Sequence, residues 1–212
     1  MLATVTPTHL DPAAEERFWR GIHAAERFFM GEAEVQKALE KLVDLLHAND
    51  IPYAIIGAMA LNAFGYRRTT VAVDVLLTSE GLARFKARYL GRGYLETFPG
   101  SRGMRDTEYG VDIDIVLAGS YPGDGKPKPV VFPDPGIAAD RGARVALLPL
   151  EVLIELKLAS GLTAADRLKD LADVQELIRI KQLPRSVATE LDPFVRVKYL
   201  ELWEGVQPRT DR

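Results

Sequence analysis

The chain has 212 residues, of which 47% are hydrophobic and 27% are charged, and its formal net charge is −3. This size and composition indicate one sizeable folded domain, or a domain with a helical appendage, and exclude a disordered chain. The small negative charge argues against a protein that coats nucleic acid by bulk electrostatics, although a local basic patch stays open. The absence of cysteine excludes disulfides and thiolate sites.

The N-terminal segment has neither a basic stretch nor an apolar one typical of a signal peptide. No apolar run approaches the roughly 18 residues that a membrane-spanning helix requires. The three histidines, His9, His23 and His47, show no pairing at helical spacing, so a zinc site is not expected. The sequence therefore predicts a soluble, cytoplasmic protein.

The first elements in chain order are helices. Asp11-Pro12 is a plausible N-cap with proline at the first helical position, and the apolar periodicity then continues to Asn49. Gly31 is expected to divide this stretch into two helices. We predict a helical N-terminal arm over residues 1–50.

Alternating short strands and helices come next, and they predict a core of residues 51–148. A strand ends at Gly57, which opens a short helix, and further strands come after it. The loop 121–136 is rich in proline and is expected to be irregular. The predicted strands cover residues 53–56, 71–77, 94–98, 105–109, 111–117 and 144–147.

The last part of the chain, residues 149–212, is predicted to be a helical subdomain. An apolar helix over 149–160 is expected to end at Gly161, and Thr163 to Asp166 read as the capping box of the next helix. Two shorter helices should come after it, around 185–191 and 193–204. The fold class is mixed α/β: a twisted mixed sheet, with helices on one side, between helical ends.

Two of the predicted strands carry acidic residues on one face. Asp74 alternates with the valines of 71–77, and Asp112 and Asp114 alternate with the apolar residues of 111–117. If the two strands are neighbours, about 4.8 Å apart, these carboxylates meet on one surface. Clustered carboxylates repel unless a cation lies between them, and Mg²⁺ with oxygen ligands is the usual solution.

A second signal precedes these strands. In Ile56-Gly57-Ala58 a strand ends in glycine just before a helix, a geometry that directs free backbone N–H groups at an anion. Arg67, Arg68 and Thr70 lie between this junction and Asp74. Each piece is weak alone, and together they favour a phosphate-handling site.

These motifs resemble the nucleotidyltransferase superfamily with the polymerase-β-like core, in particular its small bacterial AbiEii toxin-like branch. That family has a glycine junction, then an Arg-x-Thr-x-Asp-x-Asp strand, a third Asp on a later strand, and a helical Lys…Arg-x-Lys-Asp-x-x-Asp segment. The resemblance covers roughly residues 50–180. Its matching positions here are Gly57, Ala58, Arg68, Thr70, Ala72, Asp74, Asp114, Lys157, Arg167, Lys169, Asp170 and Asp173.

The resemblance implies a nucleotidyltransferase fold and transfer of a nucleoside monophosphate from an NTP to a hydroxyl group, with Mg²⁺ or Mn²⁺. The acceptor could be a tRNA end, a protein side chain or a small molecule such as an antibiotic, and the toxin-like branch favours RNA or protein. The resemblance further implies a toxin–antitoxin toxin with a cognate antitoxin as partner and no membrane partner. Nucleotide-binding residues would be Gly57, Ala58, Arg68, Thr70, Lys157 and Asp170. Metal ligands would be Asp74 and Asp114, with Asp112 as an extra acid, and Asp173 or Asp170 would orient the acceptor.

Two residues depart from the family pattern. Ala58 replaces a Gly or Ser and loses only a hydroxyl contact. Ala72 stands where the first metal-binding aspartate belongs, so the form with Ala72 is expected to be impaired. Three explanations stay open: an engineered inactivating substitution, natural degeneration to a pseudoenzyme, or compensation by Asp112.

Simpler interpretations also stay open for several of these residues. The acids of the two strands could be solvated residues on an exposed sheet face, and Gly57 could serve only a turn. Lys157 could extend to solvent from an apolar helix, and Asp170 and Asp173 could be ordinary exposed helix acids. The competing function is a non-catalytic module that binds a nucleotide or a partner on the same fold.

Overall fold

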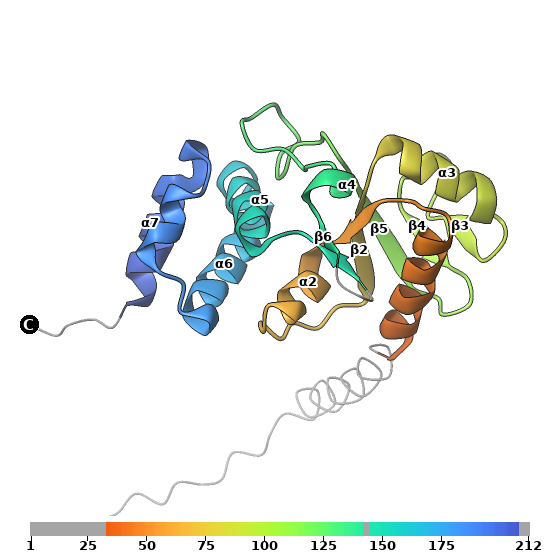
Figure 1. Ribbon diagram of the computed structural model, residues 1–212, viewed down its shortest axis with the longest axis horizontal. Coiled ribbons are helices and arrows are strands. Elements are labelled where there is room, and N and C mark those ends of the chain that lie inside the picture. The colour runs from red at the N-terminus through yellow and green to blue at the C-terminus, as the bar shows by residue number, and fades with distance from the viewer. Residues whose placement is uncertain (1–32, 142–144, 208–212) are drawn as a thin grey trace, which may run out of the picture.

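The computed structural model describes residues 33–141 and 145–207. The fold is mixed α/β: a seven-stranded sheet in the order β3-β4-β5-β2-β1-β7-β6, flanked by helices (Figure 1). The predicted helix before Gly31 lies outside the described residues. The strands are β1 Tyr53–Ile55, β2 Ala72–Leu77, β3 Tyr94–Glu96, β4 Met104–Asp106, β5 Asp112–Leu117, β6 Asp140–Arg141 and β7 Ala146–Leu147.

The helices agree with most of the predicted ranges. Residues 33–48 are helical, and further along the chain several helices begin at recognisable caps. Thr78 accepts a hydrogen bond from the Gly81 N–H at the start of α3, and Asp192 accepts one from the Phe194 N–H at the start of α7. The helices are α2 Gly57–Ala63, α3 Ser79–Tyr89, α4 Pro135–Ala138, α5 Leu150–Thr163, α6 Leu168–Lys181 and α7 Pro193–Val206, with 3-10 turns at Ala165–Arg167 and Arg185–Thr189.

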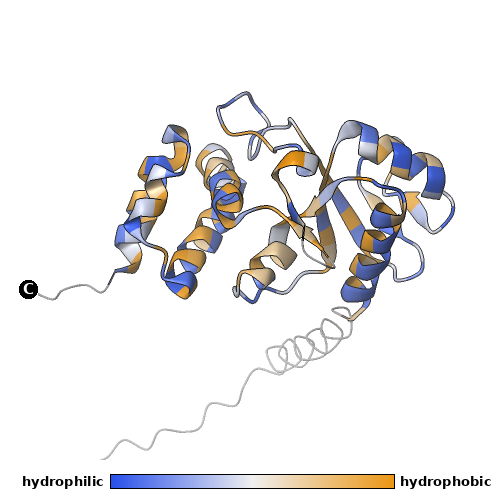
Figure 2. Ribbon diagram, in the orientation of Figure 1, coloured by the Kyte–Doolittle hydropathy of each residue, from blue (hydrophilic) through white to orange (hydrophobic). Residues whose placement is uncertain are grey.

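The sheet is mixed because β2 pairs antiparallel with β1 but parallel with β5. Alternation along β2 directs Val73 and Val75 to one face, where they pack with the helix 33–48 and α3. Leu76 faces the other side and packs with residues of α2 and α5 to α7. Helices therefore cover both faces, and the expectation of helices on one side is wrong. Figure 2 shows hydrophobic residues along the strands and hydrophilic ones on α3.

The boundary between α5 and α6 differs from the prediction. Gly161 does not end a helix, because α5 continues through it to Thr163. The Thr163 hydroxyl donates to the Ala159 carbonyl at 2.8 Å within α5, so it does not cap the next helix. A 3-10 turn, Ala165–Arg167, leads into α6 instead. The predicted capping box is wrong because a local i−4 hydrogen bond competes for the same hydroxyl.

Gly161 allows α5 and α6 to pack closely. A Cβ atom at position 161 would lie 2.5 Å from Leu171 Cγ, so we expect Gly161→Ala to lower the free energy of unfolding by about 1–3 kcal/mol through overpacking. Chemical denaturation measures this change. Gly205→Ala in α7 is the matched control, since its nearest neighbour would be 3.6 Å away, and it should be neutral or stabilising. Equal effects at the two positions would contradict the packing argument.

Candidate active site

The two acid-bearing strands are neighbours, as the alternation suggested. β2 and β5 run parallel, and their register places Asp74 directly beside Asp114 and Ala72 directly beside Asp112. Burial raises the pKa of Asp74, and the adjacent Asp114 carboxylate raises it further, against the lowering effect of nearby cations, including Lys157 and Arg167. Asp74 and Asp114 therefore form a like-charged pair on the sheet face that carries α5 and α6.

Asp112 is occupied elsewhere. Its carboxylate accepts a hydrogen bond from Arg105 Nη1 at 2.8 Å, and both side chains are about half exposed. For Asp112 to join Asp74 and Asp114, its side chain would have to leave this ion pair. Within residues 33–141 and 145–207, no cluster of three or more Asp, Glu, His or Cys side chains is arranged to hold a metal ion.

Gly57 lies against the Asp74 carboxylate. A Cβ atom at position 57 would lie 2.0 Å from Asp74 Oδ2 and 2.8 Å from Asp74 Cβ, and the glycine has φ of +66°. The backbone N–H of the preceding residue, Ile56, donates to the Asp74 carbonyl at 3.0 Å. Only glycine therefore fits where β1 gives way to α2 beside the acid, and Ala58 is buried inside that helix.

We expect Gly57→Ala to displace the Asp74 side chain as well as to strain the backbone. The clash with Asp74 Cβ cannot be relieved by rotating the carboxylate, so divalent metal binding should weaken together with folding stability. Gly91→Ala is the matched control, because Gly91 has a similar φ of +74° with no atom within 4 Å of the added Cβ. Titration of Mn²⁺ by electron paramagnetic resonance, beside thermal unfolding, measures both effects. If Gly57→Ala loses stability only as much as Gly91→Ala and keeps its metal affinity, the displacement is refuted.

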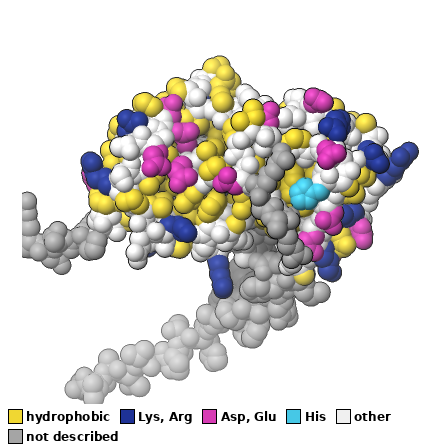
Figure 3. Space-filling model, in the orientation of Figure 1, with side chains coloured by type: hydrophobic (Ala, Val, Ile, Leu, Met, Phe, Trp, Pro, Cys, Tyr) yellow, Lys and Arg dark blue, Asp and Glu magenta, His cyan; other side chains and the backbone are white. Residues whose placement is uncertain are grey.

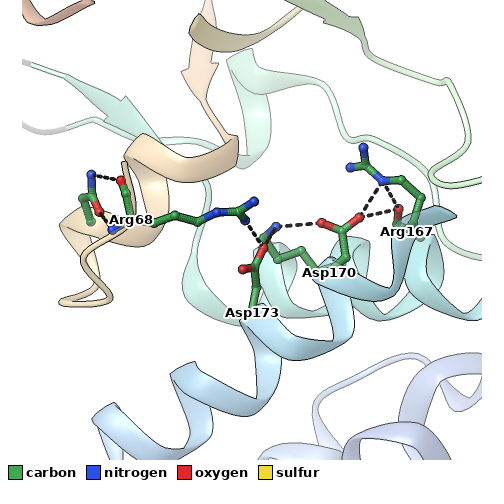
Figure 4. A network of polar contacts seen from close by, with 7 residues as sticks. Arg68, Arg167, Asp170 and Asp173 are labelled. Atoms are coloured by element: carbon green, nitrogen blue, oxygen red, sulfur yellow. Dashed lines mark hydrogen bonds and ion pairs between the residues drawn. The ribbon is translucent and has the colours of Figure 1, made fainter. Parts of the chain in front are cut away.

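A buried ion-pair network joins α5 and α6 next to this pair (Figure 4). Lys157 Nζ donates to Asp170 Oδ1 at 3.0 Å and to Asp173 Oδ2 at 2.7 Å. All three residues are buried, so the interpretation of Asp170 and Asp173 as exposed helix acids is wrong. Burial alone would raise the pKa of Asp170, but Lys157, Ser160 and Arg167 together hold it below its usual range.

Arg68 connects the segment before β2 to this network. Its Nη1 donates to Asp173 Oδ2 at 2.5 Å, and its backbone N–H and carbonyl both bind the Asn62 side chain. Thr70 makes local contacts only: its hydroxyl donates to the Ala72 carbonyl at 2.9 Å. The structure thus places Arg68 and Asp173 together, whereas Thr70 stabilises the backbone at the start of β2.

Two hollows open beside Asp74. A cavity of ≈ 110 Å³ is lined by Gly57, Asp74, Lys157 and Asp170 among others, and a wider cleft of ≈ 690 Å³ lies next to it. The two share Val116, Phe132, Ser160 and Arg167 as lining residues. The sequence motifs included Arg167 without assigning it a role, and they omitted Ser160. Arg167 lies three residues before Asp170, and Ser160 lies three residues after Lys157. Residues with this spacing share a helix face, so the spacing was the sequence signal that could have identified both.

The face shown in Figure 3 carries interspersed acidic, basic and hydrophobic side chains over the described residues. This distribution agrees with the small net charge of −3. None of the described helices has the length and apolar character needed to cross a membrane.

No protein-family model matches the chain, and no curated protein matches it. Among solved structures, it is similar to an antigenic nucleotidyltransferase-like protein from Paracoccidioides brasiliensis, at 15% identity and a TM-score of 0.44 over 70% of this chain and 77% of that one. It is also similar to the antibiotic-resistance factor ANT(2'')-Ia in solution, at 15% identity and a TM-score of 0.47 over 82% and 92% of the two chains. A crystal structure of ANT(2'')-Ia in complex with adenylyl-2''-tobramycin gives 13% identity and a TM-score of 0.49 over 81% and 98%. Each of these TM-scores is below 0.5, so these similarities say nothing about the role of individual side chains in this protein. Those roles follow from the contacts of the side chains themselves.

Proposed function

We propose that this chain has the framework of an Mg²⁺-dependent nucleotidyltransferase of the polymerase-β-like superfamily. The observation that carries the proposal is the placement of Asp74 directly beside Asp114 on parallel strands, with Asp74 against Gly57 and lining a cavity. In the proposed reaction, a hydroxyl oxygen attacks the α-phosphorus of an NTP. The bond to the pyrophosphate oxygen breaks, and the hydroxyl proton leaves to a base.

The residues present fit Mg²⁺, or Mn²⁺ in its place. Mg²⁺ is usually held by one or two carboxylates plus substrate phosphates, and Asp74 and Asp114 supply two hard carboxylates side by side. When bound, the ion would offset the charge of the triphosphate and favour deprotonation of the attacking hydroxyl. Gly57 and Ala58 would carry the triphosphate on their backbone. For Asp173 or Asp170 to orient the acceptor, as the motif implies, that buried carboxylate would have to leave its contact with Lys157.

The acceptor and the biological role rest on the family resemblance in the motifs. We propose a hydroxyl of RNA, in particular tRNA, or of a protein as the acceptor. We also propose a cytoplasmic toxin with a cognate antitoxin, of the AbiEii-like kind. With Ala at position 72 the chain has one acid fewer than the family pattern, so its turnover is expected to be low.

Ala72 favours a second candidate, a non-catalytic module that binds a nucleotide or a partner on the same framework. Whether or not the site is catalytic, we expect it to bind a nucleotide through Mg²⁺, with the ion held by the Asp74–Asp114 pair and bound to the triphosphate. Calorimetric titration with each of the four NTPs, with and without Mg²⁺, tests this expectation. We expect binding that depends on Mg²⁺ and that Asp114→Asn weakens strongly. If no NTP binds, both the enzyme and the nucleotide-binding module are refuted, and only partner binding is left.

A further inference from the structure

The cations around the cavity are not equally free to meet a phosphate group. Lys157 Nζ already contacts two carboxylates, Asp170 and Asp173, and its side chain is 9% exposed. Arg68 is ion-paired to Asp173. For Lys157 to turn to a ligand phosphate, the buried Asp170 and Asp173 would lose an ion-pair partner, which is unfavourable. Arg68 lines neither the cavity nor the wider cleft. Lys157 therefore holds α5 and α6 together, and Arg68 holds the segment before β2 against α6.

Arg167 is arranged differently. Its Nε donates to Asp170 Oδ2 at 2.8 Å and to Ser160 Oγ at 3.3 Å, while Ser160 Oγ itself donates to Asp170 at 2.7 Å. Within the part of the chain that the structure describes, neither terminal nitrogen of Arg167 has a hydrogen-bond partner. Figure 4 shows the rest of the guanidinium group extending past the contact with Asp170.

Arg167 also lies where a phosphate would have to be. It lines both the cavity beside Asp74 and the wider cleft, and its side chain is 42% exposed, so a ligand can reach it. A guanidinium held at Nε presents its two terminal nitrogens in a fixed fork that matches two oxygens of a phosphate.

We infer that Arg167, clamped by Asp170 and Ser160, is the residue that binds the triphosphate, and that Lys157 and Arg68 support this clamp through the buried acids. This inference rests on the proposed function and names a specific residue for it. The sequence motifs favoured Lys157 and Arg68 for that role. In the structure, Lys157 and Arg68 are ion-paired to buried acids, whereas neither terminal nitrogen of Arg167 has a partner among the described residues.

The test compares Arg167→Gln with Arg179→Gln. Arg179 lies in the last turn of α6. It is also paired with an acid three residues away, Glu176, but it lines neither hollow. Calorimetric titrations in Mg²⁺ use the NTP that the unmodified protein binds, and inorganic triphosphate as a probe without base or ribose. We expect Arg167→Gln to lower the affinity for both ligands by about tenfold or more, while Arg179→Gln leaves both affinities unchanged. Arg167→Lys should be intermediate, because it keeps the charge but loses the clamp.

Each outcome decides a different question. If the unmodified protein binds no NTP, the proposed function fails and the role of Arg167 fails with it. If NTP binds and Arg167→Gln binds it as tightly as Arg179→Gln does, the proposed function stands and Arg167 is not the phosphate ligand. A loss of NTP affinity without a loss for inorganic triphosphate would also overturn the inference, because it would indicate a contact with the base or ribose.

Discussion

Ala72→Asp is expected to raise Mg²⁺-dependent nucleotidyl transfer by roughly 10²–10³-fold, the size of effect typical of one electrostatic contributor to catalysis. Position 72 lies on the same face of β2 as Asp74, two residues before it, and directly beside Asp112 on β5. A carboxylate there would complete the Asp-x-Asp pattern of the family and extend the Asp74–Asp114 pair. The measurement is transfer of label from each α-labelled NTP to tRNA, to protein or to the enzyme itself.

The matched control is Val71→Asp. It adds the same charge one residue earlier, just before β2 begins, at a residue that is already 67% exposed. We expect no gain from it, and Asp74→Asn should remove the gain from Ala72→Asp. If Ala72→Asp labels no acceptor and binds no more Mn²⁺ than the unmodified chain, the missing-ligand explanation is wrong and the non-catalytic candidate is favoured.

Lys157→Met is expected to lower the free energy of unfolding by about 3–5 kcal/mol, because it leaves Asp170 and Asp173 buried without their shared cation. Methionine keeps most of the volume, so the loss reflects charge rather than a cavity. Chemical denaturation at pH 7 measures it. Lys198→Met, which breaks an ion pair with Glu201 on α7, is the control and should cost much less.

The pH dependence of the same variant distinguishes charge from packing. In the unmodified protein the pKa of Asp170 is lowered below its ordinary value of 3.8, so its contribution to stability is complete above that value and is lost as the pH falls through the folded-state pKa. Without Lys157, Asp170 loses the largest of the effects that oppose burial, so its pKa rises. The deficit of Lys157→Met should therefore shrink as the pH falls from 7 toward 4, and a deficit that is independent of pH would contradict the mechanism.

The sequence alone was sufficient to predict which acids lie on one face of each strand, because alternation over six residues determines which side chains share a face. It predicted that Asp74 and Asp114 would meet if β2 and β5 were neighbours, and they are. The parallel direction of that pairing was not predictable, since it depends on the chain connections. The strand β6 was not predicted, because its two residues are too few to show a periodic pattern.

The helices show where local patterns are overridden by packing. Gly161 looked like a helix end, but α5 continues through it. The glycine instead leaves space for Leu171 of the neighbouring helix. Asp170 and Asp173 looked like exposed acids because an isolated helix does not reveal a buried lysine on another helix. The role of Arg167 depends on which of its nitrogens are already bound, and only three-dimensional contacts reveal that.

The position of β1 in the sheet has a consequence for synthesis on the ribosome. β1 lies between β2, which comes soon after it in the chain, and β7, with which Ile55 pairs at Leu147. Until residue 147 has emerged, β1 has one edge without its partner strand, and such an edge is prone to pairing with other chains. We therefore expect the nascent chain to depend on chaperones through the middle of translation, and truncations before β7 to aggregate.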